Sequence, residues 1–303
     1  MKYVITGGAG FIGSNLVDEL VSQSHEVHVI DNFISGKKEN CNKDAKYHEI
    51  DIADEANLGI IENVLDKCDT VFHCAALARV QPSILNPIKY ELNNTIGIMN
   101  MLKCSVDIDV RRFVYSASSS AYGSTKKLPS KESDKPNPIS PYANQKYYGE
   151  LCCKMFSKVY SIETVSLRYF NVYGERQNLG GAYATVVGVF LNQSINKKPL
   201  TINGDGNQRR DFTYVGDVVS ANILAAKSKN VGKGEVINIG NGENLSINEL
   251  AKNIGGEVVF NEPLNEPFEN LADIKKAKKL LDWEPTTDLI SWIRNYKKTK
   301  GLK

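Results

Sequence analysis

The feature that most constrains the fold of this chain is a glycine-rich stretch near its N-terminus, at residues 7–13. It follows Tyr3–Thr6, a β-branched run typical of a strand, and it opens Phe11–Ser22, which has helical periodicity. Gly7 permits a tight turn, Gly10 lets the backbone approach a pyrophosphate, and Gly13 allows the helix to pack closely on the strand. The helix N-terminus offers free amide hydrogens and the positive end of its dipole to phosphates. This order of strand, turn and helix predicts a dinucleotide-binding site.

The first half of the chain continues this alternation of strand and helix. Apolar and β-branched runs predict strands at Glu26–Ile30, Thr70–Cys74 and Arg112–Ser116. Helical periodicity appears at Glu55–Lys67 and Pro87–Val106. The alternation is typical of an α/β fold, here a Rossmann-type doubly wound parallel sheet with helices on both faces.

The second half of the chain has a different organisation. Loops rich in Gly, Pro and Asn follow Asn171, which indicates a smaller α/β region built onto the sheet. Val236–Ile239 is typical of one more strand, returning to the main sheet. We therefore expect a cofactor-binding Rossmann domain over residues 1–170, with a return strand near 234–240. A substrate-binding C-terminal region over residues 171–303 would then be interleaved with that domain.

An acidic residue at the end of the second predicted strand bears on the choice of cofactor. Asp31 stands where a carboxylate can bond both hydroxyls of an adenosine ribose and repel a 2′-phosphate. NAD is therefore favoured over NADP, although Lys37 and Lys38 weaken the preference; the alternative is that Asp31 only forms a turn after the strand. Asp51 and Ile52 end another apolar stretch, which could face the adenine.

A tyrosine followed four residues later by a lysine is a candidate catalytic pair. The pattern occurs three times, as Tyr122/Lys126, Tyr142/Lys146 and Tyr296/Lys300. Tyr122 precedes a glycine and is expected in a loop, and Tyr296 lies in a charged tail. Tyr142 follows Ser140-Pro141, an N-cap residue and a proline at the first helical position. It therefore begins a helix, and Lys146 lies one turn later on the same face.

This helical pair has a chemical use. A phenol has a reference pKa of ~10, which is too high for a base at neutral pH. The ammonium of Lys146 and a positively charged nicotinamide both favour the phenolate of Tyr142. Lys146 can also hold the nicotinamide ribose. Ser118 ends a predicted strand, and its hydroxyl could bridge a substrate oxygen and Tyr142. The alternative is that Tyr142 and Lys146 are ordinary residues of a helix surface.

A series of motifs runs in order along nearly the whole chain. They are Gly7–Gly13, Asp31-Asn32, His73-Cys74-Ala75-Ala76, Asn94-Thr95-Ile96-Gly97, Ser116–Gly123, Tyr142/Lys146, Arg168–Gly174, Gly204-Asp205-Gly206, Arg210-Asp211-Phe212 and Ala272-Asp273. The series resembles that of the extended short-chain dehydrogenase/reductases, specifically the UDP-glucose 4-epimerase group.

The resemblance implies roles for the matching residues. The catalytic residues would be Ser118, Tyr142 and Lys146. The cofactor-binding residues would be Gly7, Gly10, Phe11, Ile12, Gly13, Asp31, Asn32, Ser35, Gly36, Asp51, Ile52, Ala75, Ala76, Asn94, Tyr142 and Lys146. The substrate-binding residues would be Ser118, Ser119, Asn171, Arg210 and Asn270. Within these sets, Asn171 and Arg210 would hold the substrate diphosphate or sugar, and Asn94 would order the active-site helix.

Two positions before the Ala-Asp pair affect the choice of substrate. The resembling family commonly has an arginine that grips the diphosphate where this chain has Pro263. Either another cation, such as Arg209, Lys197 or Lys198, replaces it, or nucleotide affinity is weakened. In the same family a bulky tyrosine excludes N-acetylated sugars at the position of Asn270. The smaller asparagine predicts that such sugars are admitted, unless Asn270 is only a polar loop residue.

The loop after Ser118 bears on the reaction. Related dehydratases have an Asp-Glu pair there and decarboxylases a glutamate, whereas this chain has Ser119-Ser120-Ala121. Hydroxyls alone suit oxidation and reduction without elimination. The resemblance therefore implies an NAD-dependent epimerase that inverts C4 of a UDP-sugar, UDP-glucose/UDP-galactose and the N-acetylated pair, through a transient 4-keto intermediate. The alternatives are another nucleotide-sugar oxidoreductase or reductase of the same family, or a non-catalytic dinucleotide sensor.

Composition excludes several other classes of protein. The net charge of +2 is too small to imply binding to nucleic acid or to a membrane surface. From the sequence we expect neither a signal peptide nor an apolar run that could cross a bilayer. Its six cysteines and four histidines lack metal-ligand spacing, so no metal site is expected. Scattered cysteines without a signal peptide indicate the reducing cytoplasm. The resemblance further implies a homodimer through the helices near Pro87–Val106 and Tyr142–Val159.

Overall fold

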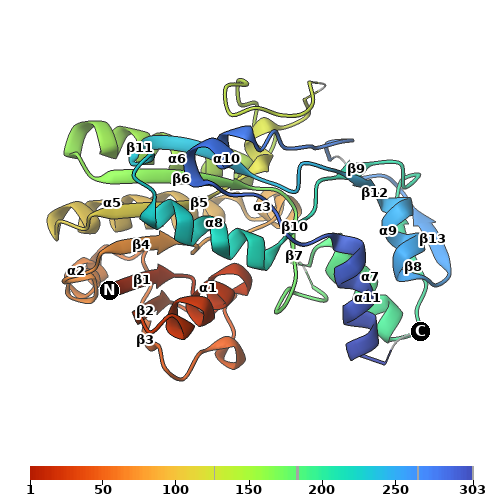
Figure 1. Cartoon of the computed structure of the whole chain (residues 1–303), viewed down its shortest axis with the longest axis horizontal. Coiled ribbons are helices and arrows are strands. Elements are labelled where there is room, and N and C mark those ends of the chain that lie inside the picture. The colour runs from red at the N-terminus through yellow and green to blue at the C-terminus, as the bar shows by residue number, and fades with distance from the viewer. Residues whose placement is uncertain (126, 182–183, 265, 302–303) are drawn as a thin grey trace.

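The centre of the fold is a seven-stranded, wholly parallel sheet with the strand order β11-β6-β5-β4-β1-β2-β3 (Figure 1). The computed structural model describes residues 1–125, 127–181, 184–264 and 266–301. The strands are β1 (Lys2–Thr6), β2 (Glu26–Asp31), β3 (Lys46–Glu49), β4 (Thr70–His73), β5 (Arg112–Ser118), β6 (Glu163–Tyr169) and β11 (Lys233–Ile239). The order reverses between β1 and β4, as in a doubly wound sheet, which confirms the predicted fold class.

Helices cover both faces of this sheet. One face carries α1 (Phe11–Ser22), α8 (Val215–Lys227) and α10 (Lys275–Leu281), and the other carries α2 (Leu58–Leu65), α5 (Gly97–Asp107) and α6 (Pro141–Tyr160). Consecutive residues of β1 show the division, because Tyr3 and Ile5 belong to the first apolar core and Val4 to the second. Side chains alternate along a strand, so a strand covered on both faces needs an unbroken apolar run.

Two helices expected from periodicity are interrupted. The segment predicted as one helix over Pro87–Val106 consists of α4 (Pro87–Glu91), the π-helical turn η3 (Leu92–Ile96) and then α5. The segment predicted over Glu55–Lys67 begins with the 3₁₀ turn η2 (Glu55–Asn57) and continues as α2. The short α3 (Val80–Leu85) precedes α4. Periodicity finds the buried face but does not distinguish helices of different pitch.

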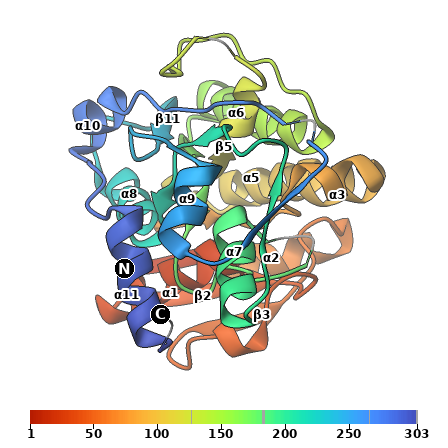
Figure 2. The ribbon, with the colours of Figure 1, turned by 90° about the vertical axis from the view of Figure 1, so that its right-hand side faces the viewer.

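A smaller region lies beyond the carboxyl ends of the strands. Its elements are β7 (Val172–Tyr173), α7 (Val186–Ile195), β8 (Leu200–Asn203), β9 (Arg209–Arg210), β10 (Thr213–Tyr214), β12 (Leu245–Ser246), α9 (Ile247–Ile254), β13 (Val258–Asn261) and α11 (Leu289–Thr299). Figure 2 looks onto this end of the molecule, with α7, α9 and α11 in front of the sheet. The region has its own apolar core, which includes Phe190, Leu250 and Trp292.

The two regions share one continuous chain path. After β10, α8 and β11 rejoin the Rossmann part, and β11 pairs with β6 over the segment expected to return to the main sheet. The chain then leaves again to form β12 and α9 before α10 packs near β11. Among the described helices, none is long and apolar enough to cross a membrane.

Candidate active site

A cavity of about 1010 Å³ lies between the sheet and the smaller region. Its wall includes the glycine-rich turn, the end of β2, the segment after β4, the end of β5, the start of α6 and the loop after β6. Ligands of doubly wound sheets bind at the carboxyl ends of the strands, where the strand order reverses. The volume is at the upper end of that usual for a small-molecule site, which suits a cofactor and a substrate side by side.

The glycine-rich turn leaves room for a phosphate group. Gly7 has a φ of +70°, and a Cβ there would stand 2.7 Å from the Ala75 nitrogen. A Cβ on Gly13 would stand 2.3 Å from the Gly7 carbonyl oxygen, so the helix can approach the turn only without a side chain. Helix α1 begins after Gly10 with no side-chain cap and no acid in its first turn. Its first amide hydrogens are therefore available to an anion in the cavity.

The acid at the end of β2 is fixed by the backbone around it. Ala9 N–H donates to Asp31 Oδ2 at 2.9 Å, and Phe33 N–H donates to Oδ1 at 2.8 Å. A Cβ on Gly36 would stand 2.8 Å from Oδ1, so glycine lets that loop close over the carboxylate. Asp31 lines the cavity together with its predicted companions Asn32, Ser35 and Gly36. It is therefore positioned to accept hydrogen bonds from a ribose.

One predicted cofactor residue is not part of the wall. Ile50 and Ile52 line the cavity, whereas Asp51 does not. The Asp51 carboxylate accepts the Ala53 amide hydrogen at 2.9 Å, and its carbonyl oxygen accepts from Asn57 Nδ2 at 3.0 Å. Asp51 thus shapes the turn after the strand, and the apolar side chain of Ile52 remains to face an adenine. Direct contact of Asp51 with the cofactor stays a prediction.

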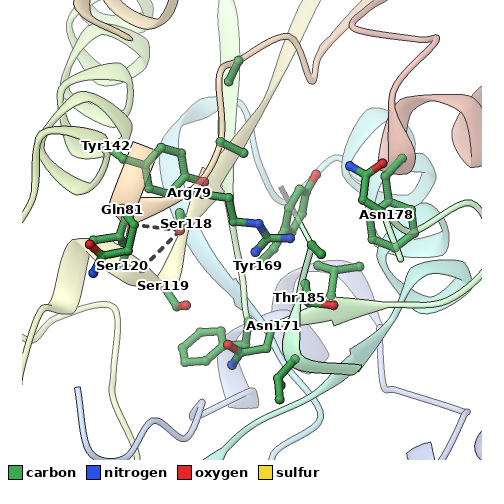
Figure 3. A pocket seen from close by; sticks show the side chains of 18 of the residues that line it. Arg79, Gln81, Ser118, Ser119, Ser120, Tyr142, Tyr169, Asn171, Asn178 and Thr185 are labelled. Carbon is green, nitrogen blue, oxygen red and sulfur yellow. Dashed lines mark hydrogen bonds between the residues drawn. The ribbon is translucent and has the colours of Figure 1, made fainter. Parts of the chain in front are cut away.

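Ser118 and Tyr142 meet at the cavity wall from different elements (Figure 3). Ser118 ends β5, and its Oγ accepts from the Ser120 hydroxyl at 2.9 Å and from the Ser120 amide at 3.2 Å. Tyr142 lies in the first turn of α6, which Ser140 caps by accepting the Ala143 amide hydrogen at 3.2 Å. The Ser118 hydroxyl lies near the Tyr142 phenol and lowers the pKa of that phenol. The two hydroxyls form a short relay open to the cavity.

The electrostatic surroundings of Tyr142 combine opposing effects. Burial raises the pKa of its phenol, and the nearby Ser118 hydroxyl and the charge of Arg79 lower it. Lys146 lies one turn along α6, and burial lowers the pKa of its ammonium to about 8. Its Nζ donates to the Ser116 carbonyl oxygen at 2.8 Å, and the residue is 4% exposed. Lys146 is a buried cation behind the wall and does not line the cavity.

The other two candidate tyrosines, Tyr122 and Tyr296, have surroundings that indicate a role in folding and not in catalysis. Tyr122 ends the 3₁₀ turn η4 (Ser119–Tyr122) where an irregular loop was expected, and its hydroxyl donates to Asn238 Oδ1 at 2.7 Å. Its ring lies 4.6 Å from the Arg168 guanidinium, and its pattern partner Lys126 lies outside the described residues. Tyr296 belongs to α11, away from this cavity. Only Tyr142 of the three combines a helical lysine partner with the serine.

Asn94 acts at one remove from the cavity. It lies in η3, and its Nδ2 donates to Gln145 Oε1 and to the Leu77 carbonyl oxygen, both at 3.0 Å. Its Oδ1 accepts the Leu77 amide hydrogen at 2.8 Å. The side chain thus ties the segment after β4 to α6, beside Lys146. Asn94 therefore orders the active-site helix by a direct hydrogen bond. Because Asn94 does not line the cavity, its predicted contact with the cofactor is not supported.

The predicted substrate asparagines bond to each other. Asn171 Nδ2 donates to Asn270 Oδ1 at 3.0 Å and to the Asp211 carbonyl oxygen at 2.7 Å. Asn270 Oδ1 also accepts the Asp211 amide hydrogen at 2.9 Å. Both amide hydrogens of Asn171 are therefore used, which leaves its oxygen to accept from a sugar hydroxyl. The Nδ2 group of Asn270 remains available to donate, and both residues line the cavity.

Arg210 brings a positive charge to the same wall. Its Nη1 donates to the carbonyl oxygens of Arg209 at 3.0 Å and Phe268 at 3.1 Å. Its Nη2 lies 3.3 Å from Glu266 Oε2. Burial lowers the pKa of Arg210, but a guanidinium remains charged at neutral pH. The hydrogen bonds to backbone oxygens fix the position of the Arg210 guanidinium. An incoming anion could displace only the carboxylate of Glu266 from it.

None of the three cations proposed from sequence to replace the arginine missing at Pro263 lines the cavity, and which cation replaces it stays a prediction. Arg209 bonds Asn244 at 2.8 Å instead of lining the cavity, and Lys197 and Lys198 are exposed elsewhere. Pro263 itself lines the cavity, and so does Arg79, which the sequence analysis missed. The available signal was a lone arginine directly after a run of small apolar residues at 75–78.

The site and the fold together define a class, that of enzymes with a dinucleotide-binding sheet and a tyrosine–serine pair beside a second ligand site. The sequence matches the NAD dependent epimerase/dehydratase family over residues 3–240, and the chain belongs to this family. This membership confirms the resemblance stated above and an NAD-dependent, epimerase-like enzyme.

Individual relatives cover the whole chain. A putative UDP-glucose 4-epimerase of Methanocaldococcus jannaschii is 39% identical, over 98% of this chain and 99% of the relative. The crystal structure of UDP-glucose 4-epimerase from Thermotoga maritima with UDP-glucose has a TM-score of 0.92 and 37% identity, covering 99% of each chain. UDP-glucuronic acid 4-epimerase from Bacillus cereus, in complex with UDP-glucuronic acid and NAD, has a TM-score of 0.90 and 33% identity, covering 99% of each chain.

Proposed function

We propose that this chain is an NAD-dependent epimerase that inverts C4 of a UDP-sugar, with UDP-glucose/UDP-galactose and the N-acetylated pair as candidate substrates. The observation that carries the proposal is the hydroxyl pair of Ser118 and Tyr142 in a cavity large enough for cofactor and substrate. The turn after Ser118 offers Ser119 and Ser120 and no carboxylate. Such a wall can move a proton to and from a sugar oxygen but lacks an acid–base pair for elimination.

The described residues fit NAD as the cofactor. The turn around Gly7 and Gly13 would hold the pyrophosphate, Asp31 would accept from the adenosine ribose, and Ile52 would pack against the adenine. The carboxylate of Asp31 disfavours a 2′-phosphate, so NAD is preferred over NADP. NAD, when bound, supplies reversible acceptance of a hydride from C4, and the protein supplies position and electrostatics.

The chain's own residues handle the proton. Tyr142 accepts the proton of the sugar 4-hydroxyl through its contact with Ser118. It returns the proton after the transient 4-keto sugar has rotated in the site and presented its opposite face. Lys146, buried one turn away, supplies a fixed positive charge beside the phenol's helix. Asn171 accepts from a sugar hydroxyl, and Arg210 binds the diphosphate once Glu266 has moved aside.

The division of labour follows the fold. Residues 1–170 with β11 hold the cofactor, and residues 171–303 hold the nucleotide end of the substrate. The placement of Arg210 and Asn270 on the smaller region, across from Ser118 and Tyr142, supports this division. Because the chain passes between the regions several times, they are expected to unfold together.

The same chain is expected to form a homodimer through the helices near Pro87–Val106, which are α4, η3 and α5, and through α6. Ile88 is 76% exposed on α4, and Met155 and Val159 are 41% and 61% exposed on α6. Exposed apolar side chains on two helices that contact each other suit an interaction surface. Ile88→Asp should convert a dimer into a monomer by light scattering. Phe260→Asp, on the distant β13, should leave the mass unchanged, and a monomeric wild type would refute the proposal.

A cytoplasmic location is proposed from the cysteines. All six, Cys41, Cys68, Cys74, Cys104, Cys152 and Cys153, are unpaired in the structure. Unpaired and mostly buried thiols suit a reducing compartment. Localisation of a tagged protein by cell fractionation tests this, and recovery outside the cytoplasm would contradict it.

The test of the reaction is product analysis with a panel of UDP-sugars and no added reductant. UDP-glucose labelled with deuterium at C4 should yield UDP-galactose that retains the label, because the hydride returns to the carbon it left. Substoichiometric NAD should sustain many turnovers. Net consumption of NADH or NAD would indicate a reductase or dehydrogenase instead, and binding of NAD without any conversion would indicate a sensor.

A further inference from the structure

Asp211 is a buried carboxylate behind the substrate wall, in the segment between β9 and β10. It is 0% exposed and does not line the cavity. Arg210 precedes it in the chain, and its backbone is hydrogen-bonded to the side chains of Asn171 and Asn270. The function proposed above uses these three wall residues, but it does not explain what holds them in place.

The side chain of Asp211 joins two segments that are far apart in the sequence. Its Oδ1 accepts the Asn241 amide hydrogen at 2.6 Å, and its Oδ2 accepts that of Gly242 at 3.1 Å, just after β11. Oδ2 also accepts the Ala272 amide hydrogen at 3.0 Å, two residues after Asn270. Hydrogen bonds to an ionised acceptor are roughly twice as strong as neutral ones. One carboxylate therefore fastens the end of β11 to the segment that carries Asn270.

The backbone of Asp211 holds the two wall asparagines directly. Its N–H donates to Asn270 Oδ1 at 2.9 Å, and its carbonyl oxygen accepts from Asn171 Nδ2 at 2.7 Å. Figure 3 shows Asn171 among the side chains that line the cavity. These two hydrogen bonds decide which end of each amide remains for a ligand, namely Nδ2 of Asn270 and Oδ1 of Asn171.

The approach of β11 to this carboxylate depends on a glycine. A Cβ on Gly240, the residue after β11, would stand 2.4 Å from Ala272 Cβ and 2.9 Å from Asp211 Oδ2. Burial raises the pKa of Asp211 to about 6, against the lowering effect of its three amide hydrogen bonds. The carboxyl group is therefore mainly ionised at neutral pH and can accept all three bonds.

We propose that Asp211 is the positioning residue of the substrate wall, which places Asn171, Arg210 and Asn270 for a sugar nucleotide by holding their segments together. This inference rests on the proposed function, because it takes those three residues as the binding residues of a UDP-sugar. Loss of Asp211 should weaken binding of the UDP-sugar, whereas the NAD site, built on β1, β2 and α1, should stay intact. A purely structural carboxylate would change stability alone.

A second buried carboxylate supplies a matched control. Asp217 is 4% exposed, belongs to α8 and does not line the cavity. It accepts from the Thr286 amide at 3.1 Å, from the Thr286 hydroxyl at 2.7 Å and from the Thr287 amide at 3.1 Å. In Asp211→Asn and Asp217→Asn alike, an NH₂ group replaces one acceptor oxygen and faces donors. Both variants should therefore melt below wild type, but only Asp211→Asn should affect the substrate.

Calorimetry at pH 8 with NAD, and with UDP-glucose on the NAD-loaded protein, tests this difference. Asp211→Asn should bind UDP-glucose roughly tenfold to hundredfold more weakly than wild type, because several wall contacts shift together. Its affinity for NAD should change by less than about threefold, and Asp217→Asn should keep both affinities within that factor. KM of Asp211→Asn should rise with the loss of affinity while kcat falls less, since Ser118 and Tyr142 belong to other segments.

Hydrogen–deuterium exchange of the wild type tests the proposal even if Asp211→Asn fails to fold. Residues 240–244 do not line the cavity, yet UDP-glucose should slow exchange of this peptide, because Asp211 couples its amides to the wall. Unchanged exchange there overturns the proposal, as does wild-type affinity in a folded Asp211→Asn or an equal loss in both variants. If UDP-glucose binds as expected but is not inverted at C4, the epimerase proposal fails and the positioning role stands.

Discussion

Replacing Tyr142 with phenylalanine removes a single oxygen from the site and tests the proton relay. The hydroxyl lies near Ser118, and even a full hydrogen bond between two such groups contributes only about 1 kcal/mol net to stability. Tyr142→Phe should therefore fold, melt within a few degrees of wild type and bind NAD normally. The cap at Ser140 and the buried Lys146 do not depend on that oxygen.

The effect on turnover should be far larger than the effect on stability. Proton transfer by a positioned side chain typically contributes roughly 10²–10⁴-fold, equal to about 3–5 kcal/mol of barrier. We expect kcat of Tyr142→Phe to fall by this factor with KM little changed, since the phenol acts mainly in the transition state. Initial rates of UDP-glucose conversion, followed by chromatographic separation of the epimers, measure both constants.

Two matched variants make the test specific to this tyrosine. Tyr122→Phe strips a buried hydrogen bond from Asn238, so it should lower stability by about 1–3 kcal/mol yet change kcat less than tenfold. Tyr296→Phe, on α11, should change neither. Near wild-type turnover of Tyr142→Phe, or a catalytic collapse of Tyr122→Phe at unchanged stability, would refute the assignment.

Three further predictions concern cofactor, substrate and stability. Calorimetry should show at least tenfold tighter binding of NAD than of NADP, and Asp31→Asn should narrow the gap because the repelling charge is gone; equal affinities in wild type would contradict this. Asn270→Tyr should abolish turnover of UDP-N-acetylglucosamine by steric exclusion and spare UDP-glucose, and retained N-acetyl turnover would disprove the gate. Glu150→Gln should lower the free energy of unfolding in urea by about 3–5 kcal/mol, because Glu150 and Arg168, each 2% exposed at the side chain, form a buried pair at 2.6 Å; an unchanged midpoint would argue against it.

Local signals explain what the sequence made predictable. The glycines at 7, 10 and 13 and the Ser140-Pro141 cap each act within one turn of chain, so their geometry follows from neighbours. Both appear in the structure where they were expected. The parallel sheet also follows from local alternation, because a buried strand such as β1 must be apolar on both faces.

Long-range partners explain what could not be predicted. Whether Asn94 touches the cofactor depends on Gln145, a residue of another helix. A spacing pattern assigns a residue to a neighbourhood, but the hydrogen-bond partners that decide its role come from elsewhere in the fold.

The cation at the substrate site shows the same limit more sharply. The sequence has a proline at position 263 where an arginine was expected, and the substitutes proposed from sequence were other basic residues of the C-terminal region. In the folded chain the segment after β4 lines the same cavity as Pro263, and Arg79 belongs to that segment. Several elements contribute charged side chains to one cavity. The absence of an arginine at one sequence position therefore does not mean that the cavity lacks a cation. Arg79 and Arg210 thus reach one cavity from segments more than 100 residues apart in the sequence, a closeness that no local pattern indicates.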